Sequence, residues 1–111
     1  MRKVSGEAME IILTSEYQTE LQGLVDWLIE ELAAVSIVPT ELQWTILVNH
    51  LNEMLRRSKT DDTIPEVDPL MFSEVSSEAL NLADGVVKKI DNLTKDEMYV
   101  LSIHFETAKQ N

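Results

Sequence analysis

The segment TELQWTILVNHLNEMLRR, residues 40–57, decides the fold because it carries a helix start, an apolar stripe and a basic end. Thr40 and Gln43 have the spacing of a capping box, in which the first turn satisfies its own free hydrogen-bonding groups. Arg56 and Arg57 lie at the other end, where cations suit the helix dipole. The segment therefore predicts an amphipathic helix, whose buried stripe is Leu47, Leu51, Met54 and Leu55.

Two histidines lie on the edges of apolar helix faces, and each has a charged residue seven positions away. Arg57 follows His50, and Glu97 precedes His104. If the two helices pack antiparallel, residues at the same level have a constant sum of residue numbers, and both pairs have the same sum. One register therefore places the two imidazoles opposite each other and Arg57 opposite Glu97.

The N-terminal half predicts a long helix over residues 15–35, in which Ser15 and Gln18 have capping-box spacing. The connector at 36–39 is short enough to fold this helix back on the central one as a hairpin. Residues 1–13 form an N-terminal arm of uncertain structure: a packed arm, an extension of the next helix and a dimer contact all fit. Residues 14–111 are expected to form a single helical domain.

The C-terminal half predicts a loop, a short helix opening at Pro69 and capped by Asp68, and two longer helices. Ser76 or Ser77 starts the first longer helix, which ends near residue 90 and has Gly85 on the side away from its apolar stripe. The second covers residues 94–108, with Thr94 and Glu97 as a capping box and Met98, Leu101, Phe105 and Ala108 as its apolar face. No strand pattern competes, so the fold class is all-α, with four longer helices and one short helix.

Composition excludes several classes of protein. The chain has 111 residues, no cysteine and 44% hydrophobic residues, which fits one packed domain without disulfides. Its formal charge of −11 would repel phosphates, so direct nucleic-acid binding is not expected. No apolar run approaches the roughly 20 residues of a membrane span, and no signal peptide is evident. We therefore expect a cytoplasmic protein with no membrane contact.

Catalytic chemistry has little support in the sequence. Two histidines with scattered carboxylates do not provide the three or four clustered ligands of a metal site. There is no nucleophile-triad signature and no glycine-rich phosphate loop. We expect no enzyme activity, no metal and no cofactor. A simpler explanation also exists for each singled-out residue: His50 and His104 as structural hydrogen bonders, Glu97 as a capping residue and Arg57 as a helix-end cation.

Three stretches, NHLNEMLRR, DPLMFSEVSSEALNLAD and LTKDEMYVLSIHF, together resemble the PTS regulation domain, or PRD, family. The resemblance spans residues 24–108 and includes the seven-residue spacings around both histidines. It implies a five-helix bundle with two antiparallel helix pairs, one of them formed by the central and last helices. The chain resembles a single, stand-alone PRD, with Asp68 in a turn where the family has asparagine.

The resemblance also implies a function. His50 and His104 match the family's phosphorylatable histidines, and Arg57, Glu97 and Asn49 would support the phosphate or orient the rings. The donor would be the histidine-containing phosphocarrier of the bacterial sugar phosphotransferase system, or a phosphorylated sugar-transporter subunit. The module would regulate transcription of carbohydrate genes, as a homodimer and through an effector-domain regulator. The residue before the first histidine is often aspartate in this family, so a constitutive helical interaction module without phosphorylation is the alternative.

Overall fold

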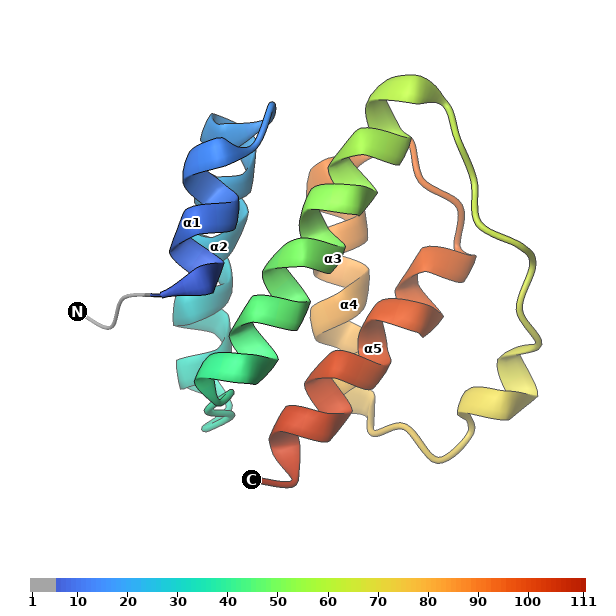
Figure 1. Ribbon diagram of the computed structural model, residues 1–111. Helices are drawn as coiled ribbons and strands as arrows, with labels where there is room; N and C mark the ends of the chain where they lie inside the picture. Colours follow the sequence, from blue (N-terminus) through green and yellow to red (C-terminus); the bar gives the residue numbers. More distant parts are fainter. Residues whose placement is uncertain (1–5) are drawn as a thin grey trace.

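A computed structural model describes residues 6–111, and every regular element in this range is helical (Figure 1). In chain order these elements are α1 (Glu7–Thr14), α2 (Gln18–Ala34), α3 (Glu41–Thr60), the short 3₁₀ helix η1 (Pro69–Phe72), α4 (Ser77–Ile90) and α5 (Asp96–Lys109). The predicted all-α, five-helix class is confirmed. The fifth α-helix is α1, whereas the short element predicted at Pro69 is the 3₁₀ helix.

Helix α3 organises the bundle because it packs against each of the other four α-helices. In Figure 1 it runs between α1 and α2 on one side and α4 and α5 on the other. Its apolar face supplies much of the core, with Trp44, Leu47, Val48, Leu51, Met54 and Leu55 all buried. The stripe predicted for the central segment is therefore the centre of the folded protein.

The predicted capping box of α3 is confirmed. The Gln43 backbone N–H donates to the Thr40 hydroxyl at 3.1 Å, and the Thr40 N–H donates to the Gln43 side-chain oxygen at 2.9 Å. The helix ends at Thr60 rather than at Arg57. The next residue, Asp61, takes a left-handed conformation with φ 57°. The turn beyond Arg57 is polar, so the apolar pattern gave no sign that the helix continues through it.

The N-terminal half differs from the prediction in its helix starts. Ser15 does not cap a helix with Gln18, because α2 begins only at Gln18. The Ser15 hydroxyl instead accepts from the Tyr17 N–H at 2.9 Å and donates to Asn52 of α3 at 2.6 Å. Of the alternatives for residues 1–13, packing is observed for residues 7–14, where the fully buried side chains are Ala8 and Ile12. Residues 1–5 of that arm lie outside the described residues.

Helix α4 starts and packs largely as its pattern indicates. The Ser76 hydroxyl accepts from the Ala79 N–H at 3.2 Å, and the Asp68 carboxylate caps η1 through the Leu70 N–H at 3.0 Å. Gly85 is not on an open outer face, because it is partly buried against Trp27 of α2. A Cβ built on Gly85 would be 2.8 Å from the ring of Trp27. A side chain at this position would therefore force the Trp27 ring to shift, whereas periodicity alone assigned the position to the outer face.

Helix α5 begins without the predicted capping box of Thr94 and Glu97. The Thr94 hydroxyl is buried and has no hydrogen-bond partner among the described residues. The Glu97 carboxylate points to α3 instead, where Arg57 donates two hydrogen bonds to it. The Glu97 side chain therefore binds Arg57 of α3 rather than capping its own helix.

Candidate functional site

The two histidines meet at the seam where α3 and α5 pack together. His50 comes from the middle of α3 and His104 from the middle of α5. The His50 Nδ1 and His104 Nε2 atoms are 3.1 Å apart, and the rings meet edge to face with an interplanar angle of 74°. The predicted spatial pairing of these imidazoles is observed. Both rings are half-buried, so the seam is neither sealed in the core nor open on all sides.

The second predicted pair occupies the same seam, about two helical turns along it. Arg57 Nε and Nη2 donate to the two Glu97 oxygens at 2.7 and 2.8 Å, which makes a bidentate pair. The Glu97 side chain is only 1% exposed and that of Arg57 12%. A buried carboxylate needs such a partner, since an isolated charge is strongly disfavoured away from water. The antiparallel register inferred from the residue numbers is therefore correct for both pairs.

Burial sets the protonation of the histidines. It is the main cause that lowers the pKa of His50 from the usual 6.5 to about 4; the charges of His104 and Arg57 act in the same direction, and Glu53 opposes them. Burial also lowers the pKa of His104. Both imidazoles are therefore neutral near pH 7, the form in which one ring nitrogen keeps a free lone pair.

The hydrogen-bonding pattern favours one tautomer of the pair. His50 Nε2 is buried and has no hydrogen-bond partner among the described residues. An unpartnered buried N–H is less tolerated than an unpartnered lone pair, so the His50 proton belongs on Nδ1. His50 Nδ1–H then donates to His104 Nε2, and the bare His50 Nε2 faces the protein interior.

Two further residues bear on the list of predicted site residues: Asn49, which was predicted, and Glu53, which was not. Asn49 is exposed and no side-chain hydrogen bond joins it to either ring, so its supporting role stays a prediction. Glu53, which the sequence reasoning missed, is close enough to His50 to raise its pKa and also pairs with Arg56 at 3.2 Å. The spacing of three residues between His50 and Glu53 on one helix was the available signal.

Two features are absent from the part of the chain that the structure describes. In that range no group of three or more His, Asp or Glu side chains is placed to hold a metal ion. None of the helices described there has the length and apolar character needed to cross a membrane. The site is therefore a two-imidazole seam with an adjacent guanidinium–carboxylate pair.

Comparisons with known proteins agree with this architecture. The family model described as PRD domain matches residues 27–108. A solved structure, the crystal structure of a PRD-containing transcription regulator from Lactobacillus casei ATCC 334, is 44% identical in sequence and superposes with a TM-score of 0.93. The match covers 99% of this chain and 98% of that one. The comparison with curated proteins found no match. With the family model covering most of the chain, and the His50–His104 and Arg57–Glu97 pairs in register, this protein belongs to the PRD domain family.

Proposed function

We propose that this PRD module is phosphorylated on His50 or His104 by the sugar phosphotransferase system and thereby controls carbohydrate-related gene expression. The observation that carries the proposal is the 3.1 Å approach of two neutral imidazoles in a seam that also holds a buried guanidinium. The similarity to a PRD-containing transcription regulator supports a regulatory rather than a catalytic role.

The chemistry requires a lone pair and a positive charge. A neutral imidazole nitrogen attacks the phosphorus of the donor phosphohistidine, and the donor's N–P bond breaks as the new one forms. The remaining ring proton of the acceptor passes to the donor ring. Alignment and positive charge at the equatorial oxygens are the main requirements of phosphoryl transfer, and Arg57 is the cation available in the seam.

Phosphorylation would also act as a switch at this seam. A separation of 3.1 Å between the facing nitrogens is filled by one hydrogen bond and leaves no room for a phosphoryl group on either atom. Modification of a facing nitrogen therefore separates the rings. The added negative charge also competes with Glu97 for Arg57, and a released Glu97 would be a buried unpaired charge. A local modification thus becomes a rearrangement of α3 against α5.

The partners follow from the same proposal. The donor is the histidine-containing phosphocarrier or a phosphorylated sugar-transporter subunit, both of which place the protein in the cytoplasm. The output is a change in a homodimer or in binding to an effector-domain regulator. Direct contact with nucleic acid is disfavoured by the formal charge of −11, so a protein partner transmits the signal.

The test is phosphorylation of the purified protein with phosphoenolpyruvate, enzyme I and the phosphocarrier. We expect an acid-labile, hydroxylamine-sensitive phosphate on His50 or His104. These are the only two histidines in the chain, so the two single alanine variants locate the label and the double variant is its matched blank. Folded wild-type protein that takes up no label on either residue rejects the proposal.

A constitutive interaction module is the alternative, and two observations favour it. The rings already hydrogen-bond to each other, and position 49 carries an uncharged, exposed asparagine. This alternative predicts that His50→Ala and His104→Ala leave partner binding unchanged under all sugar conditions. A loss of sugar-dependent binding in either variant excludes it.

A further inference from the structure

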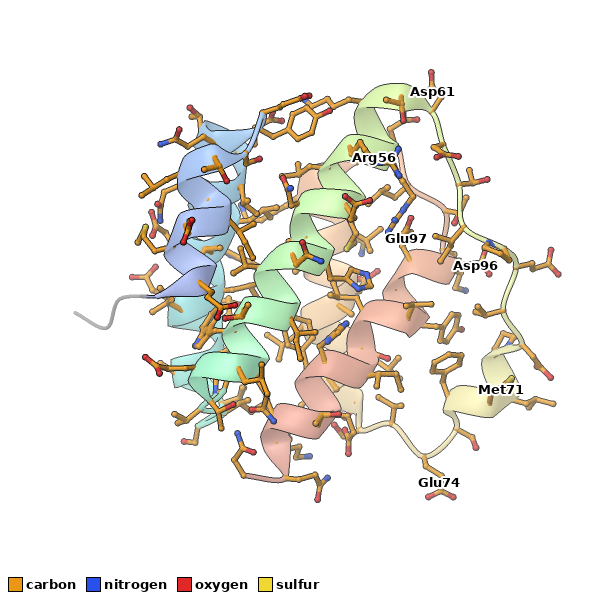
Figure 2. All side chains as sticks on the ribbon, viewed as in Figure 1. Arg56, Asp61, Met71, Glu74, Asp96 and Glu97 are labelled. Atoms are coloured by element: carbon orange, nitrogen blue, oxygen red, sulfur yellow. The ribbon has the colours of Figure 1, made fainter. Side chains whose placement is uncertain are left out.

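The 3₁₀ helix η1 presents two large apolar side chains to solvent. Leu70 is 79% exposed and Met71 78%, the highest values among the large apolar residues that the structure describes. Figure 2 shows η1 set apart from the helices, with Met71 directed away from the bundle. Such exposure contributes little to folding, because these side chains stay in water in the folded protein as they do in the unfolded chain.

The segment that carries these side chains is fixed at both ends. Before η1, the Val67 N–H donates to the Asp96 carboxylate of α5 at 3.0 Å. After η1, the Ser76 N–H and hydroxyl donate to the Glu106 carboxylate of α5 at 3.0 and 2.7 Å. The two apolar side chains are therefore held at a defined place along α5, where a partner would meet little loss of chain entropy on binding.

Inside the segment, Phe72 packs its ring against Tyr99 of α5 at a centroid distance of 5.4 Å. Phe72 thus supplies the apolar contact that holds η1 to the bundle. Leu70 and Met71 contribute no comparable burial, so the fold itself does not account for an apolar residue at either position.

The surroundings of η1, whose exposed Leu70 and Met71 form an apolar tip, are acidic. Between residues 60 and 87 the chain has no lysine or arginine. Glu66 and Glu74 are exposed on either side of η1, and neither has an ion-pair partner among the described residues. Figure 2 shows Glu74 on the outer edge of the loop. A complementary surface would have an apolar depression with lysine or arginine at its rim.

We propose that this tip, defined as η1 with Leu70 and Met71, is the docking point for the phosphocarrier that phosphorylates the histidine seam. The inference rests on the proposed function. Tyr99, which holds η1, precedes His104 on α5 by five residues, about 7.5 Å along the helix axis. Five residues also turn the helix by about 140°, so a donor seated on the tip lies beside α5 on a different face from His104, and its phosphoryl group must reach around the helix.

Charge gives a second reason for a dedicated docking element. A phosphorylated donor brings an anion toward a chain of formal charge −11, which opposes encounter. A basic rim on the donor, meeting Glu66 and Glu74, converts this repulsion into steering and orients the phosphoryl group. The apolar tip then supplies the short-range contact.

Binding of the unphosphorylated phosphocarrier, measured by calorimetry, tests docking without any transfer step. The variant Leu70→Ser/Met71→Ser is expected to raise Kd about tenfold or more, because two apolar anchors are lost. The matched control is Leu42→Ser/Ile46→Ser, which removes two exposed apolar side chains (69% and 48% exposed) from α3 and should leave Kd unchanged. An unchanged Kd in the tip variant, or no binding by the wild type, overturns the docking site.

Transfer kinetics separate this inference from the proposed function. With ³²P-labelled phosphocarrier, the tip variant should show a raised KM and an unchanged single-turnover rate at saturating donor. Glu66→Gln/Glu74→Gln should weaken the salt dependence of kcat/KM. Normal labelling of the tip variant with wild-type KM overturns docking and leaves the function standing. Tip-dependent binding without labelling of the wild type rejects the function and supports docking. A tip variant that changes only the oligomeric state assigns the tip to a second copy of the chain and overturns docking.

Discussion

The buried pair of Arg57 and Glu97 makes a quantitative prediction for Glu97→Gln. The substitution keeps the side-chain shape but removes the charge, which leaves a guanidinium only 12% exposed without its counter-ion. Removing one partner of a buried pair costs about 3–5 kcal/mol, and the residual exposure of Arg57 places the expected loss near the lower end, about 3 kcal/mol. That is a large fraction of the roughly 5–15 kcal/mol by which a domain is stable.

A surface pair provides the matched control. Lys59 and Glu20 are also 2.7 Å apart, but their side chains are 45% and 49% exposed. Glu20→Gln therefore makes the same chemical change in water, where an ion pair contributes less than about 1 kcal/mol. The comparison isolates burial as the cause of the difference.

The measurement is urea unfolding followed by far-UV circular dichroism, with the free energy of unfolding obtained by linear extrapolation. Replacing Arg57 and Glu97 together by methionine removes both charges and should recover most of the loss caused by Glu97→Gln. Equal small losses for Glu97→Gln and Glu20→Gln would refute the reasoning. So would a double methionine variant that is no more stable than Glu97→Gln.

Three further predictions use matched positions in the same unfolding assay. Thr40→Ala should cost about 1 kcal/mol of stability, because it removes the side chain that caps α3. Thr94→Val should be neutral or stabilising, because the Thr94 hydroxyl has no hydrogen-bond partner among the described residues. A larger loss for Thr94→Val than for Thr40→Ala would contradict the cap assignment. Gly23→Ala should stabilise the protein by up to about 1 kcal/mol, because no atom lies within 4 Å of the new Cβ. Gly85→Ala should destabilise it by about 1 kcal/mol, because the new Cβ would be 2.8 Å from a tryptophan ring. Equal gains in the two variants would show that the ring moves aside at no cost in free energy. Folding lowers the pKa of His50 from 6.5 to about 4, so between these pH values the unfolded chain binds more protons than the folded protein. The contribution of neutral His50 to stability is therefore complete above about pH 6.5 and is lost as the pH falls toward 4. His50→Gln should flatten that part of the profile of stability against pH, and an unchanged profile would refute the assignment.

Much of the fold was predictable because its signals act within one or two helical turns. Apolar spacing gave the buried face of α3, and the residue types at positions 40 and 43 gave its cap. The seam register was also predictable, since two antiparallel helices rise equally per residue and the two pairs share one sum of residue numbers. The residues of the candidate site thus follow from the sequence once the central and last helices are taken as antiparallel neighbours.

The errors occurred where a side chain had both a local and a distant partner. Ser15 and Glu97 have the spacing of capping residues, but Asn52 and Arg57 from α3 take their polar groups. Gly85 follows the pattern of an outer position, although the crossing of α4 over α2 brings Trp27 against it. No spacing along the chain encodes these outcomes, because they depend on which helices meet and how closely.

The sequence by itself determined the four longer helices, their buried faces and the residues that can face one another, because periodicity and capping are local properties, whereas it left α1 open. Only the tertiary structure decided the chemical state of the site. The 3.1 Å approach of the rings, the low pKa of His50 and the burial of Glu97 all arise where α3 and α5 exclude water from the seam. Desolvation depends on every element packed around a group, so it is fixed only when the chain has folded.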